Sequence, residues 1–131
     1  MSAPGSGPAD ALAALQGEWA MVFASRDGQP LSAEFVATGR RVVRGRTVTE
    51  FFRGQAFMQG TLTADDSQAP MTLDVLLTSP PGRGRRLLGL YEFDGDRLRI
   101  CVGAPGRDRP AGFEAALGSD HTLTLWRPLA P

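Results

Sequence analysis

Residues 87–102 read LLGLYEFDGDRLRICV. Two short segments within them, 87–93 and 97–102, are rich in apolar, aromatic and β-branched residues, and Asp94-Gly95 separates them. An Asp-Gly pair in this position is a strong signal for a two-residue hairpin turn, because both central residues of that turn need a positive φ. The sequence therefore predicts an antiparallel β-hairpin over these residues.

The same pattern continues on both sides of this hairpin. Apolar residues recur with a period near two, and turn residues interrupt them every eight to twelve positions. The predicted strands are residues 18–24, 41–43 (with a start as early as Phe35), 47–52, 56–63, 71–77, 87–93, 97–102, 112–117 and 121–126. Eight or nine short strands with hairpin-length connections predict an all-β protein, either an antiparallel barrel or a sandwich.

The N-terminal part of the chain has a different character. Residues 1–9 are small and mostly polar, which predicts a disordered tail. Asp10 is predicted to cap a short helix over residues 11–15, and residues 10–129 are predicted to form one domain. The first residues lack the basic start and apolar stretch of a signal peptide, so a cytoplasmic location is expected.

Composition excludes several classes of function. Fourteen Arg, with no Lys, balance fourteen acidic residues, so the net charge is zero. Nucleic-acid and anionic-membrane binders usually carry a basic excess, so neither partner is expected, and no apolar run reaches the roughly 18 residues of a membrane helix. Cys101 and His121 are each the only residue of their type, which argues against an internal disulfide and a Cys- or His-rich metal site. No metal or cofactor is predicted.

Three motifs carry a resemblance to a known family. They are LQGEW at 15–19, GLYEFDGDRLRIC at 89–101 and RPAGF at 109–113. Over roughly residues 12–127 the chain resembles a small bacterial lipocalin-like domain family first catalogued in planctomycetes, which has no general assigned function. The resemblance implies an antiparallel eight-to-nine-stranded lipocalin-like β-barrel, with Trp19 near the barrel floor beneath Arg127.

A barrel of this size either fills with side chains or holds one small ligand. The leading hypothesis is that it binds a small apolar or amphipathic molecule in its interior. Aromatic and Met side chains suit such a ligand because they offer large, adaptable apolar surfaces. The residues predicted to line the cavity are Trp19, Met21, Phe23, Phe52, Met58, Tyr91 and Phe113.

Two alternatives stay open. The first is a cofactor-free isomerase, cyclase or lyase that transfers protons through an interior carboxylate, Asp74 or Glu50, with Arg99 and Tyr91 as electrostatic partners. Asp74 faces the interior if the apolar face of its strand packs against an outer layer. The second alternative is a structural or protein-interaction module with a filled core, and a homodimer formed through an edge strand belongs to this case.

Overall fold

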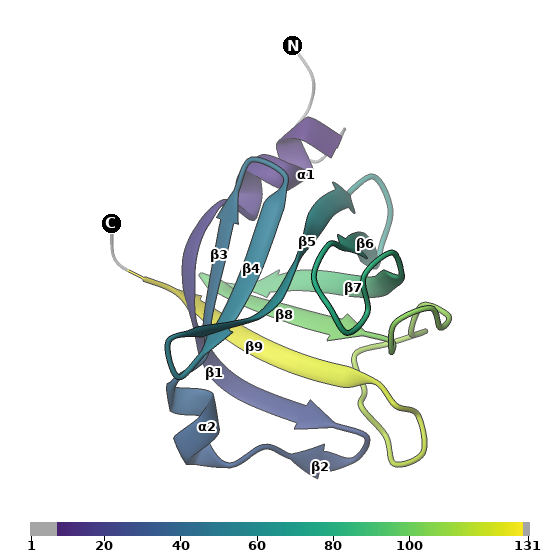
Figure 1. Ribbon diagram of the computed structural model, residues 1–131. Helices are drawn as coiled ribbons and strands as arrows, with labels where there is room; N and C mark the ends of the chain where they lie inside the picture. The colour runs from purple at the N-terminus through teal and green to yellow at the C-terminus, as the bar shows by residue number, and fades with distance from the viewer. Residues whose placement is uncertain (1–7, 130–131) are drawn as a thin grey trace.

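The computed structural model describes residues 8–129, and its main feature is a closed antiparallel β-barrel (Figure 1). Each barrel strand pairs with the next one along the chain, and β1 closes the barrel by pairing with β9. The predicted all-β fold is therefore confirmed as an eight-stranded barrel with one extra strand, β2 (Gln29–Pro30), and a short N-terminal helix. The barrel strands are β1 (Gly17–Arg26), β3 (Arg40–Arg44), β4 (Thr47–Phe52), β5 (Gln55–Asp65), β6 (Met71–Leu77), β7 (Arg86–Asp94), β8 (Arg97–Val102) and β9 (Thr122–Pro128).

One predicted strand is wrong, and so is the suggested start of the 41–43 strand at Phe35, although that strand itself is present as β3 (Arg40–Arg44). Residues 112–117 form no strand and belong to the long loop 103–121. The reason is that β8 and β9 pair directly with each other, which leaves no free strand edge between them. Phe35 lies in the helix α2 (Ala33–Ala37), which Ser32 caps by accepting a hydrogen bond from the Phe35 amide at 3.2 Å.

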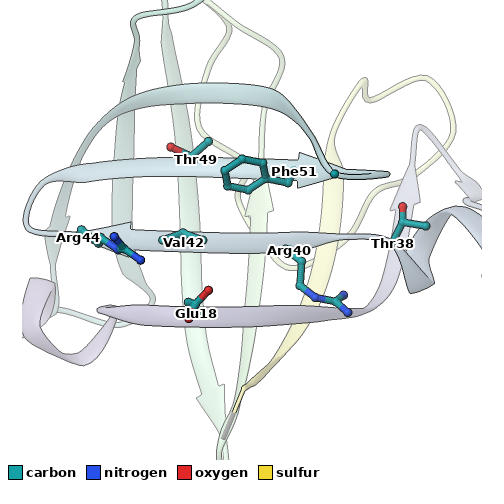
Figure 2. Close-up of a pocket in the computed structure, with 8 residues that line it drawn as sticks. Glu18, Thr38, Arg40, Val42, Arg44, Thr49 and Phe51 are labelled. Atoms are coloured by element: carbon teal, nitrogen blue, oxygen red, sulfur yellow. The ribbon is translucent and has the colours of Figure 1, made fainter. Parts of the chain in front are cut away.

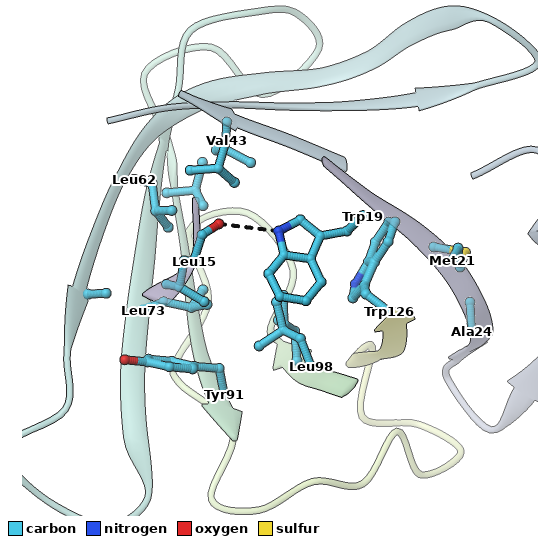
Figure 3. Packing of buried hydrophobic residues seen from close by; sticks show 14 of the residues in the cluster. Leu15, Trp19, Met21, Ala24, Val43, Leu62, Leu73, Tyr91, Leu98 and Trp126 are labelled. Atoms are coloured by element: carbon cyan, nitrogen blue, oxygen red, sulfur yellow. Dashed lines mark hydrogen bonds between the residues drawn. The ribbon is translucent and has the colours of Figure 1, made fainter. Parts of the chain in front are cut away.

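Helix α1 (Pro8–Ala14) closes one end of the barrel. It starts at Pro8, inside the predicted tail, so Asp10 lies in its first turn and is not the cap. Residues 1–7 of that tail lie outside the described residues. Leu15, just after the helix, is fully buried, and its carbonyl accepts a hydrogen bond from the Trp19 indole at 3.3 Å (Figure 3). Apolar side chains fill the barrel below it, among them Val43, Leu62, Leu73, Tyr91, Leu98 and Trp126.

A β-bulge in β1 changes which side chains face the interior. The pairing of β1 with β9 shifts register between Met21 and Phe23. Trp19 and Met21 face inward as predicted, but the extra residue reverses the alternation, so Ala24 is the next buried side chain. Phe23 is 42% exposed, and the prediction that it points into the barrel is wrong.

The implied position of Arg127 beneath Trp19 is also wrong. Arg127 pairs with Ala20 across the β1–β9 ladder, and successive residues of a strand point to opposite faces. Its side chain is exposed on the outside, while the Trp19 and Trp126 indoles belong to the same buried cluster. Among the described residues, no helix has the length and apolar character needed to cross a membrane.

Candidate functional site

The half of the barrel away from α1 contains a cavity of about 220 Å³. Strands β5 to β8 give it an apolar wall made of Met58, Leu73, Val75, Leu87, Ile100 and Val102. Thr122 and Thr124 of β9 add two hydroxyl groups. Residues at the ends of strands and in the loop 103–121 surround its rim, namely Arg26, Phe57, Gly103, Ala104, Pro105 and Asp120. The cavity therefore lies at the barrel end that the N-terminal helix does not cover.

An ion pair forms the polar part of the cavity wall. Arg41 of β3 and Glu50 of β4 are register partners, so both side chains point into the barrel. The Arg41 Nη1 donates to Glu50 Oε2 at 2.6 Å, and their side chains are 3% and 19% exposed. A charge this deeply buried needs a partner, because removing it from water is costly. Glu50 supplies that partner for one end of the guanidinium.

The rest of the Arg41 guanidinium is unsatisfied. Its Nε and Nη2 atoms are buried and have no hydrogen-bond partner among the described residues. An unsatisfied buried donor costs about 1–3 kcal/mol, so such groups are uncommon in native proteins and need an explanation. Arg99 and Arg109 also form ion pairs, but their side chains are 34% and 31% exposed, so water can reach the nitrogens that the protein leaves unpaired.

Aromatic rings and a salt bridge border the open end. Phe35 of α2 stacks on Phe52 with ring centroids 4.3 Å apart, and the Phe52 and Phe57 rings form a T-shaped pair with centroids 5.2 Å apart. Phe57 lies at the cavity rim and is largely exposed. On the other side of the rim, Arg26 Nη2 and Asp120 Oδ1 form an exposed ion pair at 3.0 Å. The open end therefore combines an exposed aromatic ring with an exposed ion pair.

The residues predicted to bind a ligand are spread over the molecule. Met58 alone among them lines the interior cavity. Trp19, Met21 and Tyr91 are packed in the core, and Phe52 belongs to the aromatic group beside the rim. Phe23 is on the outside, and Phe113 lies half-buried in the loop 103–121.

The four residues predicted for catalysis do not meet in one site. Glu50 faces the cavity, whereas Tyr91 lies in the packed core. The expectation that Asp74 faces inward is wrong, because the barrel interior itself buries the apolar face of β6. Asp74 lies on the outside and accepts a hydrogen bond from Arg109 Nη1 at 2.7 Å. Arg99 forms ion pairs with Glu92 and Asp94 across the turn between β7 and β8.

The Asp74–Arg109 pair has a clear structural role. Arg109 Nη1 also donates to the Leu73 carbonyl at 3.2 Å and to the Gly89 carbonyl at 2.8 Å. One side chain of the loop 103–121 is thereby tied to β6 and β7. Because residues of this loop form part of the cavity rim, Asp74 supports the site from outside the barrel.

Burial raises the pKa of Tyr91 to about 12, and the negative charges of Asp66 and Asp65 add to the effect. The fold thus favours the neutral phenol. This stabilisation is complete below the ordinary tyrosine pKa of about 10 and is lost as the pH rises through 12. Tyr91 is the only tyrosine, so the phenolate absorbance of the native protein should titrate near pH 12, and that of the urea-unfolded chain near 10. A native titration that overlays the unfolded one would contradict this.

A larger hollow lies on the outer surface. It has a volume of about 510 Å³ over β1, β3 and β4, and Glu18, Arg40, Val42, Thr49 and Phe51 line it (Figure 2). These side chains project from one face of a sheet into solvent, so they cannot surround a ligand. The smaller interior cavity is the better candidate because walls from several strands enclose it.

No protein-family model, curated protein or solved structure matches this chain. The similarity of its motifs to the planctomycete family therefore stays a prediction. In the structure the most specific motif, residues 89–101, forms the hairpin of β7 and β8, which supplies Ile100 to the cavity.

Proposed function

We propose that this protein binds a small, largely apolar molecule inside the open half of the barrel. The cavity bounded by β5 to β8 is the observation that supports this function. A core that is packed in one half and hollow in the other is unlike a uniformly filled structural module, for which no interior space is expected. The open end beside Phe57 and Pro105 gives the ligand a route of entry.

The volume of the cavity sets the size of the ligand. Pockets for drug-sized molecules begin at about 300 Å³, so a space of about 220 Å³ suits something smaller. An engineered apolar cavity of about 150 Å³ is known to hold benzene. We therefore assign the cavity to molecules on the scale of a substituted benzene ring or a short branched chain. The Met58 side chain at the wall can adapt to differences in shape.

Filling the cavity should abolish binding. Val102 lies on the inner face of β8, pairs with Gly89 and Thr122, and is half-buried at the wall. Val102→Phe places a ring in the space that the ligand needs, so we expect affinity for ethylbenzene to fall by about tenfold or more. Isothermal titration calorimetry with wild type and variant measures this change.

Leu76→Phe is the matched control for this experiment. Leu76 lies on the outer face of β6, next to the cavity residue Val75, and is 38% exposed. The same enlargement there should leave ethylbenzene binding unchanged. If wild type binds neither ethylbenzene nor acetophenone, the ketone of nearly the same shape, or if Val102→Phe binds them as wild type does, the interior is not the binding site. Leu87→Phe repeats the test from β7 should Val102→Phe fail to fold.

A further inference from the structure

The unpaired Nε and Nη2 atoms of Arg41 indicate which polar group the ligand carries. This inference rests on the proposed function. A guanidinium is a planar fork with five N–H donors. Glu50 engages Nη1, and the edge formed by Nε and Nη2 is the part that remains unpaired. That edge can donate two roughly parallel hydrogen bonds to acceptor oxygens. Arg41 lines the same cavity as the apolar residues of β5 to β8. Its Nε and Nη2 atoms are closed to water, so a small turn of the guanidinium toward the cavity would bring this edge to a molecule held there.

The charge balance of the cavity decides which acceptor fits best. Its charged lining residues are Arg26, Arg41, Glu50 and Asp120, two positive and two negative. They are joined as two ion pairs, Arg26 with Asp120 and Arg41 with Glu50. A carboxylate ligand on Arg41 would bring a second anion close to Glu50 with no further cation inside to balance it, which is unfavourable at low dielectric. An uncharged acceptor satisfies the same donors without that cost.

We infer that the ligand is an uncharged molecule with an apolar body and a carbonyl-type oxygen, and that this oxygen accepts hydrogen bonds from the Nε–Nη2 edge of Arg41. The apolar body lies against Val75, Leu87 and Ile100. Glu50 holds the guanidinium in place and neutralises it, so it is a positioning residue for Arg41. Small aromatic or aliphatic ketones, esters and lactones have this combination of groups.

Three ligands of nearly the same shape test the inference. Ethylbenzene has no acceptor, acetophenone has a neutral carbonyl oxygen, and benzoate has a carboxylate. Each is titrated at neutral pH into wild type and into the double variant Arg41→Met/Glu50→Leu. The double variant removes the ion pair as a unit, since removing Arg41 alone would strand Glu50.

We expect the double variant to weaken acetophenone about 3- to 10-fold, the value of one net hydrogen bond, and not to weaken ethylbenzene. Benzoate should bind wild type less tightly than acetophenone does. Equal losses for acetophenone and ethylbenzene would overturn the role of Arg41, and tightest binding of benzoate would show an anion site instead. If neither ethylbenzene nor acetophenone binds wild type, the proposed function fails, and this inference fails with it.

Arg41→Lys keeps the inference testable if the double variant does not fold. Lysine retains a positive charge for Glu50, but it has a single ammonium group in place of the planar edge. Acetophenone should lose affinity for this variant and ethylbenzene should not. An acetophenone affinity equal to that of wild type would contradict the inference.

Discussion

Arg41→Met should lower the free energy of unfolding by about 2–4 kcal/mol, although it replaces a charged residue with an apolar one of similar length. The substitution leaves the Glu50 carboxylate in the barrel interior without its cation. Breaking a buried ion pair from one side usually costs about 3–5 kcal/mol. We expect somewhat less here because the Glu50 side chain is 19% exposed and water in the cavity can reach it.

Urea denaturation of three variants separates this explanation from a general effect of losing an arginine. Arg44→Met removes an exposed arginine from the outer face of the same strand and should change stability by less than about 0.5 kcal/mol. Arg41→Met/Glu50→Leu removes both charges and should recover most of the loss. A loss below about 1 kcal/mol in Arg41→Met would mean that Arg41 and Glu50 are not a buried pair.

The strand pattern of this chain could be predicted well because barrel strands show it directly. In β8, Leu98 and Ile100 face the buried interior, and the Asp94-Gly95 turn fixes the pairing with β7. Six residues of β4 were likewise predicted with the observed limits, because Thr47–Phe52 alternates and has turn residues at both ends. Local patterns of this kind do not depend on the rest of the molecule.

The site was harder to predict because it depends on register and on packing between strands. The β3 sequence RRVVR places Arg40, Val42 and Arg44 on one face and Arg41 and Val43 on the other, so both faces mix arginine with valine and alternation does not tell which arginine is buried. Pairing with Glu50 on one side and Trp19 on the other turns Arg41 inward. The face of Phe23 also depends on strand pairing. The prediction placed Phe23 on the inner face because the local sequence pattern does not indicate the bulge of β1.

Gly89 is required by the close packing of β7 against β8, and the sequence alone does not indicate this requirement. A Cβ atom on Gly89 would lie 2.6 Å from Val102 Cγ1 and 2.8 Å from the Cys101 carbonyl oxygen. The glycine therefore allows Val102 to occupy its position at the cavity wall. Such a requirement becomes visible only when the two strands are placed side by side.

The second large loss of stability is expected for Trp19→Ala. The Trp19 indole is 6% exposed in the core cluster, and its N–H bonds the Leu15 carbonyl next to α1. Truncation removes this apolar contact, leaves a void and frees the hydrogen bond that joins the helical end to the barrel. Replacing a buried Phe or Trp with Ala costs about 3–5 kcal/mol, and we expect a loss in that range by urea denaturation.

Phe23→Ala is the matched comparison, since Phe23 is an aromatic residue of the same strand four positions later. Without the bulge, both residues would share one face of β1, and the two truncations should cost similar amounts. With the bulge, Phe23 is 42% exposed on the outside, so its truncation should cost about 1 kcal/mol or less. Equal losses for the two variants would contradict the bulge, and with it the inward-facing set of side chains at the start of β1.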